Sequence, residues 1–266
     1  MFFLYLLLHF GTAPQNKPEL DGIAHVAFRV GDVAVSREFY RKLGFEQAFE
    51  FTDAKGVTVS YVKVNDRQFI ELYRRNSAEE PLGLMHFCFD TADMEGLATI
   101  YQSRGLKPTT PRKAKAGNLL FNVFDPEGHL LEYTQYLPDS LHWNERGKHL
   151  AENRISDHLI RAAIQANDMQ ALGTFYTTKL LCESRQGGGP LRLLLPGKFH
   201  EEVELDTVSA DWKPRITFAV ADLHRAQDEL RKRGLAPQGA ASSVAVTDPD
   251  GVRVVFVTES AEVGKP

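Results

Sequence analysis

The sequence predicts an α+β protein built from four βαβββ modules that pair into two domains. Three observations support this fold class. Along the 266 residues, an apolar strand, an amphipathic helix and a set of strands follow one another in the same order four times. Short landmarks recur in the same order in the two halves, and an Asp-Pro-acid-Gly turn stands near the end of each half. Self-similarity of this kind indicates repeats of one structural unit, so a duplicated pair of modules is expected.

The first module is expected to begin with a strand over residues 23–30, where the side chains alternate as in a half-buried strand. Asp32 is suited to cap the N-terminus of a helix that runs to Leu43, and Gly44 is suited to end that helix. The later strands of this module are expected at residues 57–64 and 68–73.

The second module repeats this plan. Its first strand is expected at residues 84–89, and its helix at about 93–104, with Gly105 at the helix end. The segment 125–128 (Asp-Pro-Glu-Gly) has the composition of a tight turn. The strands on either side of this turn are expected at residues 119–124 and 129–135.

The second half of the chain carries the same landmarks. The Phe-Tyr pair at 175–176 corresponds to the pair at 39–40, and the turn at 248–251 corresponds to the turn at 125–128. A polar and charged segment separates the halves, as expected of a domain boundary. The predicted parts of the chain are an N-terminal segment (1–20), a metal-binding domain (21–137), a linker (138–156), a degenerate domain of the same type (157–260) and a tail (261–266).

The composition argues against several classes of protein. The net charge is −4 and there is no basic stripe, so nucleic acid is not an expected partner. The two cysteines, Cys88 and Cys182, are too few for a disulfide scaffold and are expected to be buried free thiols. No segment is long enough to predict a membrane span. A small molecule is the expected partner, and a homodimer is left open.

The N-terminal segment is unusually apolar. Residues 1–10 (MFFLYLLLHF) contain almost no polar side chain, and a polar stretch follows them. The apolar run is too short to span a bilayer, and it resembles the core of a secretory signal without the basic residues that precede such a core. Residues 1–13 therefore look like a truncated signal, and a cytoplasmic and an exported location both remain open.

Four polar residues stand on the less apolar faces of predicted strands. The period of two places His25 and His86 opposite the apolar faces of the first strands of modules one and two. Glu71 and Glu132 stand in the same way in the last strands, and 46 residues separate histidine from glutamate in both modules. A carboxylate inside an apolar strand is costly unless it is paired or binds a metal. We therefore expect the four side chains to meet on one concave sheet around a divalent ion.

Four segments resemble the metal-ligand strands of the vicinal oxygen chelate superfamily, which includes glyoxalases, bleomycin-resistance proteins and extradiol dioxygenases. They are IAHVAF (23–28), FIEL (69–72), LMHFCF (84–89) and DPEGHLLEY (125–133). The pattern is most similar to glyoxalase I, which has a His or Gln, a Glu, a His and a Glu at these places. The resemblance covers residues 23–135 well and 159–258 weakly, and it implies two paired-module domains of that superfamily.

The second half is expected to lack the ligand set. Its residues at the places of His25, Glu71, His86 and Glu132 are expected to be Arg161, Glu204, Thr217 and Val255. Only modules one and two supply a full quartet, so we expect them to close on each other within the N-terminal half. The second half would then complete the fold, cover the first half or shape the pocket.

The resemblance implies a glyoxalase-like lyase or isomerase that acts on a small oxygen-chelating substrate through an enediolate-type intermediate. One divalent metal ion (Zn, Ni, Co, Fe or Mn) is the expected cofactor, because two imidazoles and two carboxylates suit each of these ions. Either Glu71 or Glu132 is the candidate catalytic base that moves a proton next to the substrate carbonyl.

Two alternatives remain. The first is an extradiol-type Fe(II) dioxygenase with the triad His25, His86 and Glu132. Lys115 and Asn122 stand near the places where that family has a histidine and a tyrosine, and Glu71 as a fourth ligand would crowd out dioxygen, so both features count against it. The second is a non-catalytic protein that binds or sequesters a small molecule. The remaining histidines considered, His129, His142, His149 and His200, are expected at the surface.

Overall fold

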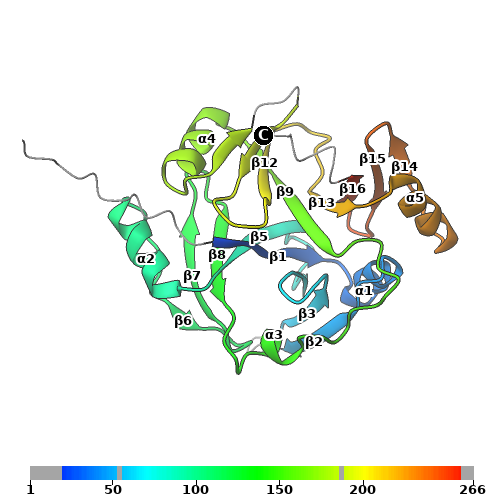
Figure 1. Cartoon of the computed structure of the whole chain (residues 1–266), viewed down its shortest axis with the longest axis horizontal. Coiled ribbons are helices and arrows are strands. Elements are labelled where there is room, and N and C mark those ends of the chain that lie inside the picture. Colours follow the sequence, from blue (N-terminus) through cyan, green and yellow to red (C-terminus); the bar gives the residue numbers. More distant parts are fainter. Residues whose placement is uncertain (1–19, 53–55, 186–188, 259–266) are drawn as a thin grey trace, which may run out of the picture.

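The chain folds into two strongly curled eight-stranded sheets (Figure 1), as predicted for two paired-module units of the α+β class. This computed structural model describes residues 20–52, 56–185 and 189–258. The predicted N-terminal segment (1–20), apart from Leu20, and the predicted tail (261–266) lie outside the described residues.

The first sheet contains modules one and two. Its strand order is β2-β3-β4-β1-β5-β8-β7-β6, and β1 pairs antiparallel with β5 at its centre. The prediction that modules one and two close on each other is therefore confirmed. The strands are β1 (Leu20–Val30), β2 (Gln47–Thr52), β3 (Thr58–Lys63), β4 (Phe69–Arg74), β5 (Gly83–Thr91), β6 (Arg112–Lys113), β7 (Leu119–Phe124) and β8 (Leu130–Gln135).

The second sheet repeats this topology with modules three and four. Its order is β10-β11-β12-β9-β13-β16-β15-β14, and β9 pairs antiparallel with β13 at its centre. The strands are β9 (His158–Ala166), β10 (Glu183–Arg185), β11 (Leu191–Leu194), β12 (Glu202–Thr207), β13 (Arg215–Val220), β14 (Gln238–Ala240), β15 (Ser243–Thr247) and β16 (Arg253–Thr258).

Helix α1 begins where the sequence predicts a cap. The carboxylate of Asp32 accepts hydrogen bonds from the backbone N–H groups of Ala34 and Val35, and Gly44 ends the helix with φ +87°. Within the described ranges, no helix is long and apolar enough to cross a lipid bilayer. The helices are α1 (Val33–Lys42), α2 (Met94–Ser103), α3 (Leu141–Asn144), α4 (Met169–Thr178) and α5 (Leu223–Lys232).

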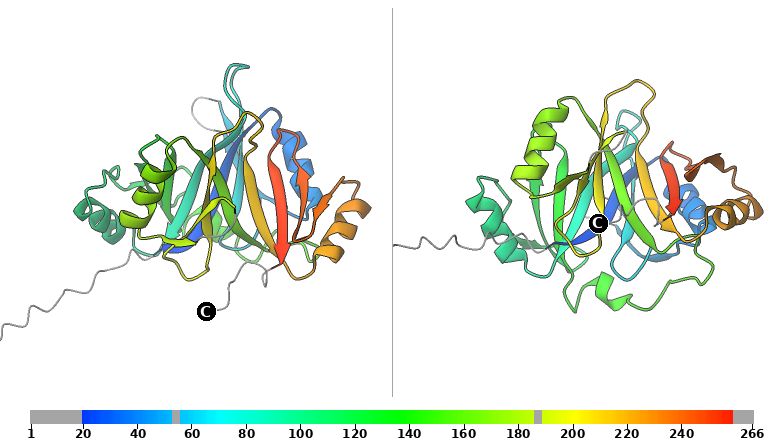
Figure 2. Two further views of the ribbon diagram at one scale, coloured as in Figure 1. Left: turned by 90° about the horizontal axis from the view of Figure 1, so that it is seen from above. Right: turned by 45° about the horizontal axis from the view of Figure 1, so that its top comes forward.

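The helices join the two halves crosswise. Figure 2 shows α1 with α5 at one side of the molecule and α2 with α4 at the other. The turn of module four meets the start of α1, because Asp250 Oδ1 accepts the N–H of Gly31 at 2.9 Å. The turn of module two meets the start of α4, because Glu127 Oε2 accepts the N–H of Asn167 at 2.9 Å. The Asp-Pro-acid-Gly turns therefore also fasten one half to the other.

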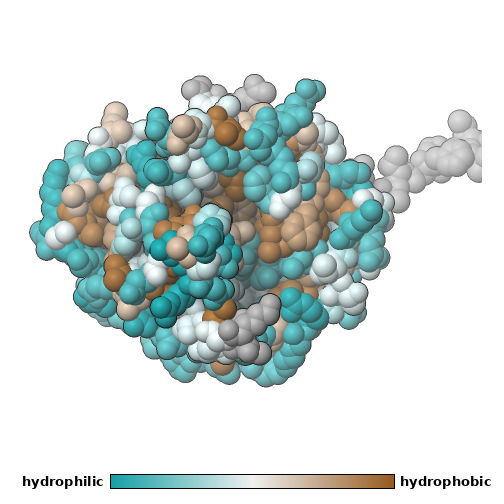
Figure 3. Space-filling model, turned by 180° about the vertical axis from the view of Figure 1, so that it is seen from behind, coloured by the Kyte–Doolittle hydropathy of each residue, from teal (hydrophilic) through white to brown (hydrophobic). Residues whose placement is uncertain are grey.

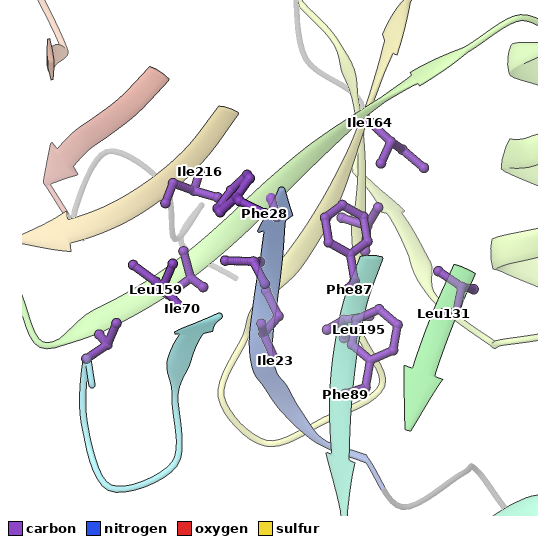
Figure 4. Packing of buried hydrophobic residues seen from close by; sticks show 14 of the residues in the cluster. Ile23, Phe28, Ile70, Phe87, Phe89, Leu131, Leu159, Ile164, Leu195 and Ile216 are labelled. Atoms are coloured by element: carbon purple, nitrogen blue, oxygen red, sulfur yellow. The ribbon is translucent and has the colours of Figure 1, made fainter. Parts of the chain in front are cut away.

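One apolar core lies between the two sheets. Figure 4 shows Phe28 and Phe87 of the first sheet in the same cluster as Leu159, Ile164 and Ile216 of the second. Because side chains alternate along a strand, the faces turned away from this core carry the polar residues. On the opposite side of the molecule from Figure 1, the surface is hollowed near its middle, and apolar side chains border the hollow (Figure 3).

Candidate metal centre

The structure brings the four predicted ligand residues together on the concave face of the first sheet. They come from the four central strands, β4, β1, β5 and β8, which are neighbours in that order. His25 Nε2 lies 3.2 Å from His86 Nε2, 3.2 Å from Glu71 Oε1 and 3.5 Å from Glu132 Oε1. His86 Nε2 lies 4.0 Å from Glu71 Oε2. We call these four side chains the quartet.

Two separations within the quartet match those expected around one first-row divalent ion, and three of its members form a mutually close set that does not include Glu71. Two ligand atoms that each lie about 2.1 Å from a common ion, at octahedral or tetrahedral angles, are roughly 3.0–3.4 Å apart. The separations of His25 Nε2 from His86 Nε2 and from Glu71 Oε1 fall inside this range. Ligand atoms of His25, His86 and Glu132 all lie within 4.8 Å of one another. The donor set, two imidazoles and two carboxylates, is one that such ions accept.

Burial acts against charge on every member of the quartet. It lowers the pKa of His86 to about 4, and it lowers the pKa of His25 well below its usual value, with the charge of His86 as the next cause. It raises the pKa of Glu71 to about 8, to which the charge of Glu132 adds, and it raises the pKa of Glu132 to about 7. A divalent cation would favour anionic carboxylates and neutral imidazoles, which are the forms that bind metal.

Neighbouring side chains orient the carboxylates. The hydroxyl of Tyr73 donates to Glu71 Oε2 at 2.8 Å, and the hydroxyl of Tyr61 also bonds to Glu71. The thiol of Cys88, buried as predicted, lies beside Glu132. Outer hydrogen bonds of this kind fix ligand orientation at metal sites. His25 Nδ1 departs from that pattern, because it has no hydrogen-bond partner among the described residues.

A family model for the "Glyoxalase/Bleomycin resistance protein/Dioxygenase superfamily" matches residues 22–133, which include the whole quartet. The match spans less than half of the chain, and over this segment the chain is similar to that superfamily. The finding agrees with the resemblance carried by the four ligand-strand segments. No curated protein matches the chain.

Solved structures share the fold over most of the chain. The Mn(II)-bound glyoxalase from Novosphingobium aromaticivorans is 16% identical, with a TM-score of 0.68 over 91% of this chain and 83% of its own. A 2,3-dioxygenase from Pseudomonas sp. KL28 is also 16% identical, with a TM-score of 0.68 over 91% of this chain and 93% of its own. At this identity the likeness establishes the architecture of two tandem paired-module units, and it does not select a reaction.

One histidine expected at the surface lies inside the cup of the first sheet, so that prediction was wrong. His142 is only 3% exposed, and its ring packs against aromatic side chains of the sheet. It belongs to the four-residue helix α3 within a largely polar segment, and only the docking of this helix turns His142 inward. His200 is exposed, and His129 and His149 are partly exposed.

The residues at the two dioxygenase positions lie apart from each other. Lys115 is exposed, and its ammonium donates to the carbonyl of Thr52. Asn122 pairs with Glu132 across β7 and β8, and its buried Oδ1 has no hydrogen-bond partner among the described residues. The cup nevertheless contains an imidazole from α3 and phenols from other parts of the domain, which the sequence analysis did not find.

The second sheet replaces the quartet with ion pairs. Arg161 stands at the place of His25 as predicted, but Arg215 and not Thr217 corresponds to His86. The earlier match was wrong by two residues: Thr217 lies opposite Arg161, just as Cys88 lies opposite His25. Arg161 Nε lies 2.8 Å from Glu202, and Arg215 Nε lies 3.1 Å from Glu204, the counterpart of Glu71. In the second sheet, guanidinium groups therefore neutralise the buried carboxylates. In the first sheet, a bound metal ion would have that role.

Proposed function

We propose that the protein is a divalent-metal-dependent enzyme that moves a proton on a small substrate with neighbouring oxygens, a lyase or isomerase of the glyoxalase type. Residues 21–137 form the metal-binding domain in this proposal, and residues 157–260 form a domain that supports it. The single observation that carries the proposal is the convergence of two imidazoles and two carboxylates at 3.2–4.0 Å on one concave sheet.

The quartet would hold the ion. When bound, a divalent ion supplies Lewis acidity, which stabilises negative charge that develops on a substrate oxygen. The protein's own residues then need to exclude water and to carry the proton. Burial of the histidines and of Glu71 provides the first of these functions.

Glu132 is the better candidate for the proton carrier. Its side chain is 15% exposed against 4% for Glu71, so it is the carboxylate that a substrate in the cup reaches more easily. The hydroxyl of Tyr73 holds Glu71 in place, whereas the neighbour of Glu132 is the weakly donating thiol of Cys88. A proton carrier needs to lie within hydrogen-bond reach of the substrate and to move slightly as it works.

The second candidate is an Fe(II) extradiol-type dioxygenase. The observation that favours it is the mutually close set of His25, His86 and Glu132, because two histidines and one carboxylate are the ligands of non-haem iron oxygenases. The position of Glu71 Oε1, 3.2 Å from His25 Nε2, counts against it, since a fourth protein ligand leaves fewer positions for substrate and dioxygen.

Elemental analysis of the purified protein tests both proposals. The expected result is about one transition-metal ion per chain in the wild type and none in the double variant His25→Ala/His86→Ala. His129→Ala/His149→Ala, which removes two partly exposed imidazoles outside the cup, is the matched control and should retain the ion. Anaerobic loading with Fe(II), Mn(II) or Zn(II), followed by assays on hemithioacetals and catechols, separates the two reactions. Wild-type protein that binds no metal but binds an aromatic ligand would support a sequestering protein instead.

A further inference from the structure

Helix α3 places an imidazole in the cup that the quartet does not use. The ring of His142 packs against Phe49, Tyr61, Phe69 and Tyr136, with ring centroids 4.7–5.2 Å apart. We call these four side chains the aromatic cage. Neither ring nitrogen of His142 has a hydrogen-bond partner among the described residues.

The aromatic cage adjoins the quartet directly. Phe69 on β4 is the cross-strand neighbour of His25 on β1, and Tyr61 on β3 is the cross-strand neighbour of Glu71 on β4. The hydroxyl of Tyr61 also bonds to Glu71. The ring of His142, which the cage surrounds, therefore lies close to the four candidate ligand residues, on the same concave face.

Burying an imidazole among these aromatic rings costs free energy of folding. Its two nitrogens are removed from water without receiving a partner, whereas a phenyl or isobutyl group would fill the same space without that cost. The desolvation of His142 is already complete in the folded protein, so a ligand oxygen that reaches it gains a hydrogen bond at little further cost to the protein. Burial also lowers the pKa of His142 to about 3. The ring is then neutral and offers one donor and one acceptor.

The docking of α3 fixes His142 in this place. The N–H of Leu141 donates to the carbonyl of Ala116, and the N–H of Gly147 donates to Asp66 Oδ1 at 2.8 Å. Arg146 stacks on Trp143, with its guanidinium 3.6 Å from the ring centroid. The predicted linker therefore brings a polar ring over the sheet from outside it.

We propose that His142 is a ligand-contacting residue, which hydrogen-bonds an oxygen of a flat, ring-bearing ligand seated against the aromatic cage with its neighbouring oxygens toward the quartet. The inference rests on the proposed metal site and narrows its substrate class. A compact aliphatic substrate bound at the quartet would not contact the aromatic cage or His142.

Two chelating probes test this on the Zn(II)-loaded protein. Tropolone is a flat ring with two adjacent oxygens, and acetohydroxamate has two chelating oxygens without a ring. Isothermal titration should show tropolone binding at least tenfold weaker to His142→Phe than to the wild type, and acetohydroxamate binding unchanged. His142→Gln, which keeps a donor and an acceptor, should bind tropolone within about threefold of the wild type. The control His149→Phe changes a partly exposed histidine of the same segment and should leave both affinities unchanged.

A second measurement needs no variant at His142. The ¹⁵N chemical shifts of its ring in the wild-type protein should change when tropolone binds and stay constant when acetohydroxamate binds. Constant shifts with tropolone, or equal tropolone affinity in His142→Phe and the wild type, would overturn the inference while leaving the metal site standing. Loss of zinc from a folded His142→Phe would also overturn it, because His142 would then belong to the metal site. Wild-type protein that fails to bind zinc would instead remove the proposed function itself.

Discussion

The metal-free protein should lose stability as the pH rises from 6.5 to 8, and most of the loss should come from the two carboxyl groups of the quartet. Both groups have an ordinary pKa of 4.5, but in the folded protein burial raises the pKa of Glu71 to about 8 and that of Glu132 to about 7. Between pH 6.5 and 8 the folded protein therefore holds protons that the unfolded chain has lost. Folding stability falls with rising pH in such a range.

The magnitude follows from the width of the window. In the folded protein, Glu71 keeps its proton up to about 1.5 pH units above pH 6.5, and Glu132 up to about 0.5 unit above it. Each pH unit for which a group keeps its proton lowers the free energy of unfolding by about 1.36 kcal/mol. The two carboxyl groups together therefore lower it by roughly 2.7 kcal/mol. The imidazoles of His25 and His86 act in the opposite direction, because burial lowers the pKa of each. Their contribution is lost mainly below pH 6.5. Above it, where the unfolded imidazoles are at most half protonated, it still grows by roughly 0.4 kcal/mol each, which offsets part of the loss and is the same in a variant that lacks the two carboxyl groups.

Calorimetry of protein stripped of metal by a chelator measures the effect. A loss of this size should lower the melting temperature by roughly 5–10 °C between pH 6.5 and 8. The matched control is Glu71→Gln/Glu132→Gln, which keeps the shape of both side chains and every other titrating group, and its melting temperature should fall markedly less. A metal-free wild type whose melting temperature stays level or rises across this window, or falls no more than that of the control, would refute the reasoning.

The single change His25→Ala should abolish stoichiometric metal binding in elemental analysis, and full retention of the ion would contradict its assignment as a ligand. Tyr73→Phe, which removes the hydroxyl that donates to Glu71 Oε2, should weaken metal binding about 10–100-fold in competition with a chelator. An affinity within twofold of the wild type would show that this hydrogen bond does not matter. Arg161→Met removes one guanidinium partner of Glu202 and Glu204, while Arg185 and Arg215 remain, so it should lower the free energy of unfolding in denaturant by about 2–3 kcal/mol, less than the cost of a wholly unpaired buried charge. The exposed ion pair lost in Lys113→Met should cost at most about 1 kcal/mol, and equal losses in the two variants would contradict the role of Arg161.

Local patterns predicted most of the architecture. The period of two identified the apolar faces of the long strands and placed the quartet opposite them, because alternation is a property of each strand by itself. The capping residue Asp32 identified the start of the first helix, and it accepts the expected backbone hydrogen bonds. The short strands β2 and β6 were missed. Strand β6 has two residues and forms by pairing with β7, which is a contact between segments that no local pattern records.

The counterpart of the quartet in the second half shows where alignment by landmarks fails. Matching turns and helix caps gave Arg161 and Glu204 correctly, yet it placed Thr217 where Arg215 stands, two residues away. A slip of two keeps every side chain on its own face, so alternation offers no warning. Cross-strand register, which only the folded sheet defines, resolved the position.

The sequence by itself determined the modules, their pairing and the four residues that converge on the cup, because each follows from periodicity within a strand or from the count of complete ligand sets. Tertiary structure alone decided that His142 faces the cup and that the Asp-Pro-acid-Gly turns hold the opposite half. Both depend on where a short polar segment docks after the sheets have formed. Local composition predicts that such a segment is exposed. Only its contacts with distant strands bury part of it.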